Sequence, residues 1–135
     1  MSESLRLEAT EDSLQAAIEF VRLGAMEAGW SGDRLGELDL IVEELFVNVA
    51  RYAYPKGVKG PVEIHWWVPR TGVLALELAD QGAPFDPLSK EDPDLTLRLE
   101  CRPIGGLGLF LVRSLTSELV YRRDGDWNRL RFEMT

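Results

Sequence analysis

The stretch "VEIHWWVPRTGVLALELAD", residues 62–80, predicts a pair of antiparallel strands. Its apolar residues fall on every second position: Val62, Ile64, Trp66 and Val68, followed by Leu74, Leu76 and Leu78. Successive side chains of a strand point to opposite faces, so each of these strands buries one face and leaves the other uncovered. The intervening "PRTG" is typical of a turn, which makes the two strands neighbours in the sheet.

The same kinds of periodicity continue on either side of this hairpin. Alternation around residues 5–9, 117–123 and 128–134 predicts three more strands. Helical spacing predicts three helices: from Thr10 or Asp12 to about Ala28, from Ser31 or Asp33 to "YPKGVKGP" at 54–61, and from a glycine-rich stretch to about Thr116. One-sided strands in the order β-α-α-β-β-loop-α-β-β indicate a two-layer α/β (α+β) sandwich, in which helices cover one face of a mostly antiparallel sheet. We expect residues 1–135 to form a single domain.

Composition and charge exclude several classes of protein. The formal charge of −8 argues against sequence-independent binding of nucleic acid, which needs a basic face. Cys101 is the one cysteine, so the chain has no internal disulfide and no Cys/His zinc spacing. The N-terminus lacks an apolar signal segment, and no apolar run approaches the length of a membrane span. We therefore expect a cytoplasmic protein with no nucleic-acid or membrane partner.

The second predicted helix carries a carboxylate and an amide on one face. In "EELFVN", residues 43–48, Glu44 and Asn48 are four positions apart and lie beside the apolar stripe. Polar groups at a core margin are costly without partners. An Asn carbonyl oxygen is a hard ligand suited to Mg²⁺, and the Glu is suited to orienting or deprotonating a nucleophile. The alternative interpretation is a solvated helix face.

The end of the predicted hairpin carries a further carboxylate. Asp80 has the parity of Leu76 and Leu78, so it points toward the helix-covered face, where an unpaired carboxylate is expensive. A carboxylate there is able to accept a hydrogen bond from an exocyclic amine such as that of adenine. Gly82 would let the backbone approach a flat base. The alternative is an ordinary Asp-x-Gly turn that ends a strand.

Three glycines open the third predicted helix. In "RPIGGLGLF", residues 102–110, Gly105, Gly106 and Gly108 precede an apolar run. Backbone N–H groups at the start of a helix are unsatisfied and lie at the positive end of the helix dipole, and glycine leaves them accessible. Such a turn is a phosphate cradle, and it supplies positive potential that this acidic chain otherwise lacks. The alternative is a hinge or a helix packed closely against a neighbour.

Together these motifs, in this order, resemble the GHKL ATP-binding domains with the Bergerat (histidine-kinase-like ATPase) fold, over residues 35–135. "EELFVNVARYAY" looks like the N box, "DQGAPFDP" like the first glycine box and "GGLGLFLVRSL" like the second. The small size and "DxGxPFDP" are most similar to the anti-sigma-factor serine/threonine kinases of the RsbW and SpoIIAB type. Ala83-Pro84 stands where many members of the superfamily have another glycine, a departure that is usual in the RsbW-like branch.

The resemblance implies roles for particular residues. Glu44 would be the general base and Asn48 the Mg²⁺ ligand beside the nucleotide, while Asp80 would read adenine and Gly82 would admit it. The glycine-box residues would hold the phosphates of ATP: Gly105, Gly106, Leu107 and Gly108. Arg102 would lie near the terminal phosphate, in a lid over residues 88–104.

The resemblance also implies an activity and partners. The chain would transfer the γ-phosphate of ATP to a serine or threonine of a STAS-type anti-anti-sigma protein, would sequester a sigma factor, and would form a homodimer. Three alternatives remain open: a non-catalytic ATP-binding regulatory module, a phosphotransfer component of a two-component (histidine kinase) system, and a structural domain whose glycines form a hinge.

Overall fold

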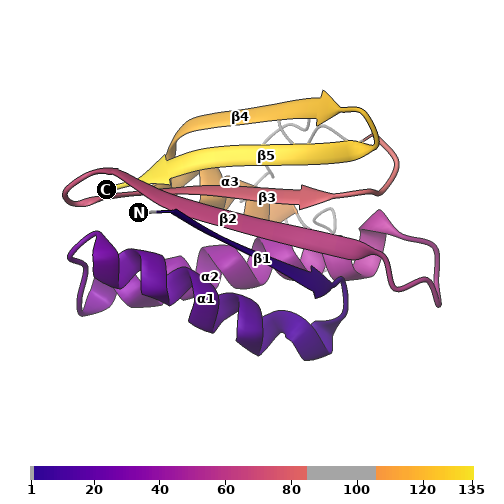
Figure 1. Ribbon diagram of the computed structural model, residues 1–135, viewed down its shortest axis with the longest axis horizontal. Coiled ribbons are helices and arrows are strands. Elements are labelled where there is room, and N and C mark those ends of the chain that lie inside the picture. Colours follow the sequence, from indigo (N-terminus) through magenta and orange to yellow (C-terminus); the bar gives the residue numbers. More distant parts are fainter. Residues whose placement is uncertain (1, 85–105) are drawn as a thin grey trace.

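The computed structural model describes residues 2–84 and 106–135, which form a five-stranded antiparallel sheet and three α-helices (Figure 1). The strands are β1 (Ser2–Glu8), β2 (Pro61–Arg70), β3 (Val73–Asp80), β4 (Ser117–Asp124) and β5 (Trp127–Met134), in the spatial order β1-β2-β3-β5-β4. The α-helices are α1 (Leu14–Glu27), α2 (Asp33–Asn48) and α3 (Gly106–Leu115). A 3₁₀ turn, η1 (Glu11–Ser13), precedes α1, and a π-helical segment, η2 (Val49–Ala53), follows α2.

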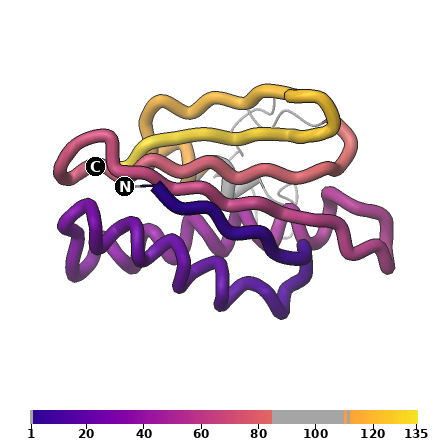
Figure 2. Tube along the Cα trace, in the orientation of Figure 1, coloured from indigo at the N-terminus to yellow at the C-terminus, as the bar shows by residue number. Residues whose placement is uncertain are grey.

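The helices and the sheet form two layers. Figure 1 shows α1 and α2 along one face of the sheet, and none of the described helices lies on its other face. The order of elements and the one-sided sheet confirm the fold class that the alternating hydrophobic pattern predicts. Figure 2 shows the described chain ends at the β2–β3 hairpin end of the sheet, so Asp80 lies at the opposite end.

The register of the strands determines which residues share the covered face. Paired residues of antiparallel strands point to the same side of the sheet. Val62 pairs with Asp80, and Asp80 pairs in turn with Asn128. Val62 is fully buried beneath the helices, so all three side chains lie on the helix-covered face. The predicted inward direction of Asp80 is therefore confirmed.

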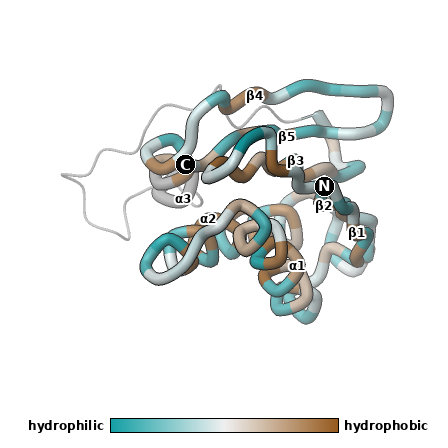
Figure 3. Tube along the Cα trace, turned by 60° about the vertical axis from the view of Figure 1, so that its left-hand side comes forward, coloured by the Kyte–Doolittle hydropathy of each residue, from teal (hydrophilic) through white to brown (hydrophobic). Residues whose placement is uncertain are grey.

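The core lies between the layers, and Trp66, which is 1% exposed, is the largest fully buried side chain among the described residues. Helix α1 crosses the sheet directly over this ring: a Cβ on Gly24 would lie 2.7 Å from Trp66 Cδ2. Figure 3 shows hydrophobic and hydrophilic residues alternating along the helices and strands, as two packed layers require. Glycine at position 24 thus allows the helix and the sheet to approach closely.

The helix ends differ in detail from the sequence prediction. We expected Ser31 or Asp33 to cap the second helix, but the N-cap residue of α2 is Gly32, with φ +66°, and no side chain caps the helix. We expected Thr10 or Asp12 to cap the first helix, but the N-cap residue of α1 is Ser13, again without a side-chain hydrogen bond. Thr10 instead begins the 3₁₀ turn through its backbone carbonyl, which accepts a hydrogen bond from the Ser13 N–H at 3.0 Å. None of the described helices is both long enough and apolar enough to cross a membrane.

Candidate functional site

The C-terminal part of α2 carries Glu44 and Asn48. Both side chains are half-buried, and neither forms a hydrogen bond or an ion pair with the described part of the chain. Directly after Asn48 the helix widens into the π-helical segment Val49–Ala53. Wide turns of this kind are frequent at functional sites. Among the described residues, the amide and the carboxylate therefore have no side-chain partner, and they lie beside an irregular helix end.

The carboxylate of Asp80 is held on one oxygen. Asp80 Oδ1 accepts hydrogen bonds from the backbone N–H of Gly82 at 2.8 Å and from Nδ2 of Asn128 at 2.9 Å. Among the described residues, nothing donates a hydrogen bond to Oδ2. Two donors on one oxygen restrict rotation of the carboxylate, so Oδ2 stays available as an acceptor with a fixed direction.

Gly82 is packed against the segment that follows α2. A Cβ on Gly82 would lie 2.4 Å from the carbonyl oxygen of Ala53. Real Cβ atoms do not approach a backbone oxygen so closely, so glycine is required here for packing between two backbones. The sequence suggested room for a flat base as the reason for this glycine. The structure adds a second reason, and the base contact stays a prediction.

Tyr54 joins the same two segments. Its hydroxyl accepts a hydrogen bond from the backbone N–H of Gln81 at 2.7 Å and donates one to the carbonyl oxygen of Pro61. Its ring covers Gly60, where a Cβ would lie 2.2 Å from the ring. Burial raises the pKa of the Tyr54 hydroxyl, so the neutral, donating form is favoured. The end of α2 is thus tied to the turn that carries Asp80.

Three site residues escaped the sequence analysis: Asn128, Tyr121 and Arg123. The Asn128 amide contacts the Asp80 carboxylate and the turn after it, and Tyr121 donates a hydrogen bond to Asn128 Oδ1 at 2.6 Å. Arg123 Nη1 donates to the carbonyl oxygen of Gly82 at 2.8 Å. One signal was available in the sequence, because Asn128 has the same inward parity as Leu130 and is a polar residue on a buried face, as Asp80 is.

The glycine-rich stretch is described from Gly106. Gly106, Leu107 and Gly108 form the first turn of α3, which packs against α2, and Val112 of α3 is 1% exposed. The structure thus brings α3 next to the helix that carries Glu44 and Asn48. Arg102, Gly105 and the expected lid over residues 88–104 lie outside the described residues.

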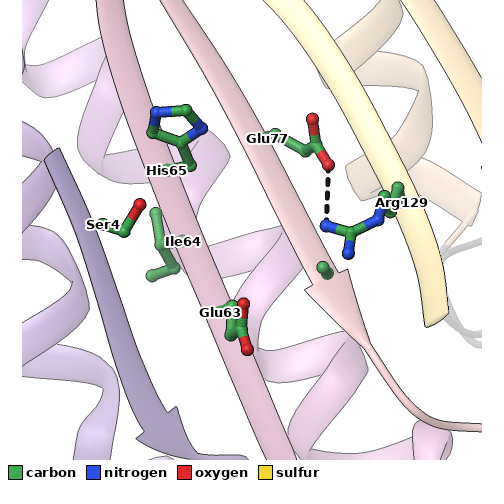
Figure 4. A pocket seen from close by; sticks show the side chains of 7 residues that line it. Ser4, Glu63, Ile64, His65, Glu77 and Arg129 are labelled. Atoms are coloured by element: carbon green, nitrogen blue, oxygen red, sulfur yellow. Dashed lines mark hydrogen bonds and ion pairs between the residues drawn. The ribbon is translucent and has the colours of Figure 1, made fainter. Parts of the chain in front are cut away.

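The opposite face of the sheet carries a separate polar hollow of about 190 Å³. Figure 4 shows its lining, in which Glu77 and Arg129 form an ion pair at 3.0 Å. His65 also lines it and lies 4.9 Å from the ring of Trp67. These side chains have the parity opposite to that of Asp80, so this hollow is not part of the candidate site. Within residues 2–84 and 106–135, no cluster of three or more His, Cys, Asp or Glu side chains is arranged to hold a metal ion by itself.

Known proteins resemble this chain in sequence. The model of the family described as "Histidine kinase-like ATPase domain" matches residues 7–134. The serine/threonine-protein kinase BtrW of Bordetella bronchiseptica is 30% identical over 130 residues, which cover 96% of this chain and 90% of that protein. The serine-protein kinase RsbW of Listeria monocytogenes is 27% identical over 117 residues, covering 78% of this chain and 74% of that protein.

Solved structures share the fold. The RsbU and RsbW domains of Rv1364c from Mycobacterium tuberculosis superpose with a TM-score of 0.67 at 14% identity; the match covers 99% of this chain but only 32% of that one. A histidine kinase domain from Erythrobacter litoralis has a TM-score of 0.54 at 18% identity, covering 90% of this chain and 60% of that one. These likenesses concern the fold alone. The sequence matches establish that this chain belongs to the histidine kinase-like ATPase domain family.

Proposed function

We propose that residues 1–135 act as one ATP-dependent serine/threonine protein kinase domain. The observation that carries this proposal is the junction of two segments. The turn with the Asp80 carboxylate is fastened to the end of α2, which presents Glu44 and Asn48 without partners among the described residues. The names of the relatives, serine-protein kinases, support a protein hydroxyl as the acceptor.

The nucleotide end of the site is proposed to read the base through Asp80. Its free oxygen is directed as an acceptor, which suits the exocyclic amine of adenine. Gly82 has no side chain that would keep a flat base away from its backbone, and its packing against the Ala53 carbonyl fixes the position of that backbone. Gly105, Gly106, Leu107 and Gly108 would hold the phosphates through backbone N–H groups, with Arg102 near the terminal phosphate.

The reactive end of the site is proposed to use Asn48 and Glu44. The carbonyl oxygen of Asn48, half-buried and without a described partner, fits the hard oxygen ligands of Mg²⁺. Bound there, Mg²⁺ would supply charge neutralisation at the phosphates. Glu44 would accept the proton of the substrate hydroxyl, the γ-phosphoryl group would pass to that hydroxyl oxygen, and ADP would leave.

The partners are proposed from the RsbW-type resemblance of the motifs. The phosphate acceptor would be a serine or threonine of a STAS-type anti-anti-sigma protein. A sigma factor would be the second partner, held inactive by a homodimer of this chain. A kinase with these partners and with ATP as donor would act in the cytoplasm.

The test is phosphate transfer from labelled ATP to a purified STAS-domain protein. We expect acid-stable label on the partner that depends on Mg²⁺, and an acid-labile product would indicate histidine chemistry instead. Glu44→Gln should bind ATP as the wild type does and transfer no phosphate, because only the base is removed. Glu43→Gln is the matched control, since Glu43 is the exposed neighbour on the same helix.

Two results would contradict the proposal. If Glu44→Gln transfers phosphate at the wild-type rate, then Glu44 is not the base. If the wild type binds Mg-ATP but labels no STAS-type partner, the chain is an ATP-sensing regulator and not a kinase.

A further inference from the structure

Asn128 lies at the centre of a buried hydrogen-bond network. It is a polar residue on the buried face of β5, 7% exposed. Its Nδ2 is 2.9 Å from Asp80 Oδ1, 3.0 Å from the Ala83 carbonyl oxygen and 3.3 Å from the Gly82 carbonyl oxygen. One amide nitrogen therefore contacts the carboxylate and the turn that follows it.

The orientation of this amide follows from its surroundings. An amide carries donors on nitrogen and an acceptor on oxygen. If the Asn128 amide were turned over, its oxygen would face three acceptor oxygens, which repel it. On the other side, the Tyr121 hydroxyl donates to Asn128 Oδ1 at 2.6 Å, which stabilises the observed orientation. Tyr121 thus reinforces the direction in which the amide donates.

The network restrains the Asp80 carboxylate, the group proposed to contact the nucleotide base. With Gly82 N–H and Asn128 Nδ2 both on Oδ1, rotation of the Asp80 carboxylate would sacrifice two hydrogen bonds. Oδ2 is therefore held as an acceptor in one direction. A purine with an amine at position 6 donates to such an oxygen, whereas a purine with a 6-oxo group places an acceptor against it.

We propose that Asn128, oriented by Tyr121, is the positioning residue that makes this site select 6-amino purines over 6-oxo purines. This inference rests on the proposed function, since it assumes that Asp80 reads the base. It assigns the selectivity to a side chain on the neighbouring strand in addition to the carboxylate itself. A buried polar group that leaves a wrong ligand with unpaired or repelling atoms is an effective source of selectivity.

A purely structural role of Asn128 predicts something different. If Asn128 only fastened the turn after β3, its loss would weaken the binding of ATP and of inosine triphosphate (ITP) by the same factor. If it directs the carboxylate, its loss weakens the binding of ATP more than the binding of ITP. The ratio of the two dissociation constants separates the roles, whereas thermal stability alone does not.

The experiment measures the dissociation constants of Mg-ATP and Mg-ITP by calorimetry for four proteins. The wild type should prefer ATP. Asn128→Asp puts an acceptor where the donor stood. It should weaken the binding of Mg-ATP by about tenfold or more and bring the ratio of the ITP and ATP dissociation constants close to one. Tyr121→Phe keeps the ring but removes the hydrogen bond to Asn128 Oδ1 that favours the observed amide orientation, and it should lower the ratio by about fivefold. Tyr52→Phe removes an exposed hydroxyl and should match the wild type.

The outcomes distinguish this inference from the proposed function. A wild type that binds neither nucleotide, or both equally, overturns adenine reading by Asp80 and this inference with it. A wild type that prefers ATP, with the same ratio in Asn128→Asp and Tyr121→Phe, overturns only the role of Asn128. If Asn128→Asp fails to fold, Tyr121→Phe decides the question, because it leaves the size and shape of the packed ring nearly unchanged.

Discussion

Gly82 and Ala53 meet backbone to backbone: a Cβ on Gly82 would lie 2.4 Å from the Ala53 carbonyl oxygen. The two residues belong to different halves of the candidate site, the turn after Asp80 and the segment after Asn48. Their contact sets how far the Asp80 carboxylate, the proposed reader of the base, lies from Asn48, the proposed metal ligand. The site is therefore one packed unit, and a substitution at the contact between Gly82 and Ala53 should change the geometry of both halves.

We predict that Gly82→Ala separates the two segments. The new methyl group meets a backbone oxygen that cannot move alone, and overpacking of this kind costs about 1–3 kcal/mol of unfolding free energy. Mg-ATP should then raise the melting temperature less than in the wild type. Gly36→Ala is the control, because a Cβ at Gly36 meets nothing within 4 Å. A variant with wild-type stability and nucleotide response would show that the Ala53 contact is not needed.

We predict that Gly24→Ala destabilises the fold although alanine favours helices. The Cβ would lie 2.7 Å from the Trp66 ring and 2.8 Å from Leu74 Cδ1, so α1 must move away from the sheet. The expected loss is about 1–3 kcal/mol by urea denaturation. Gly36→Ala in α2 should instead gain about 0.5–1 kcal/mol, the ordinary advantage of alanine in a helix. Opposite signs for the two substitutions are the decisive result, and equal signs would contradict the close packing at Gly24.

We predict that Tyr54 makes the fold sensitive to alkali. Burial raises the pKa of its hydroxyl above the value of about 10 for an unfolded tyrosine. The folded state therefore holds its proton more tightly than the unfolded state does. The resulting stability is fully present below about pH 10 and is lost as the pH rises from there through the pKa in the folded protein.

The measurement for Tyr54 is the free energy of unfolding between pH 8 and 11. Tyr54→Phe should be less stable at pH 8, by about 1–2 kcal/mol for the lost hydrogen bonds, and should lose less stability as the pH rises. Tyr52→Phe, at an exposed ring, is the matched control and should follow the wild type throughout. Parallel pH curves for the wild type and Tyr54→Phe would contradict this prediction.

We predict that Asp80→Asn abolishes most of the thermal stabilisation by ATP. A ligand at a hundred times its dissociation constant stabilises the folded state by about 2.7 kcal/mol, and weaker binding reduces this directly. The substituted amide would turn its NH₂ group away from Asn128 Nδ2, toward the base site, and present a donor to the adenine amine. The measurement is thermal unfolding with and without Mg-ATP. An unchanged shift in the variant would show that the base does not contact position 80.

We predict that Asn48→Ala reduces the gain in ATP affinity caused by Mg²⁺ and leaves recognition of the adenine base unchanged. ATP affinity in EDTA should match that of the wild type, while the gain in affinity on adding Mg²⁺ should fall by at least about tenfold, a loss seen even for outer-shell partners of a metal. Titrations of ATP with and without Mg²⁺ measure this directly. An equal loss under both conditions would mean that Asn48 contacts the nucleotide itself or supports the end of α2.

Local patterns in the sequence were sufficient for the fold and for the parts of the site that lie within one element. Alternation at residues 62–80 predicted the hairpin and its buried face, and therefore the inward direction of Asp80. The spacing of Glu44 and Asn48 placed them on one helix face for the same reason, since strand and helix periods are properties of the local backbone. The predicted N-cap of α2, Ser31 or Asp33, was wrong, because Gly32 begins that helix and no side chain caps it.

The sequence by itself determined which residues face inward, and the tertiary structure decided which of them meet. Asn128 and Asp80 are 48 positions apart, and the Tyr54 hydroxyl meets the Gln81 N–H across 27 positions. Such pairs depend on which strands are neighbours, on their register and on where the irregular segment after α2 lies. A period along the chain carries no information about any of these, because a one-residue shift in pairing preserves every local preference and changes every cross-strand partner.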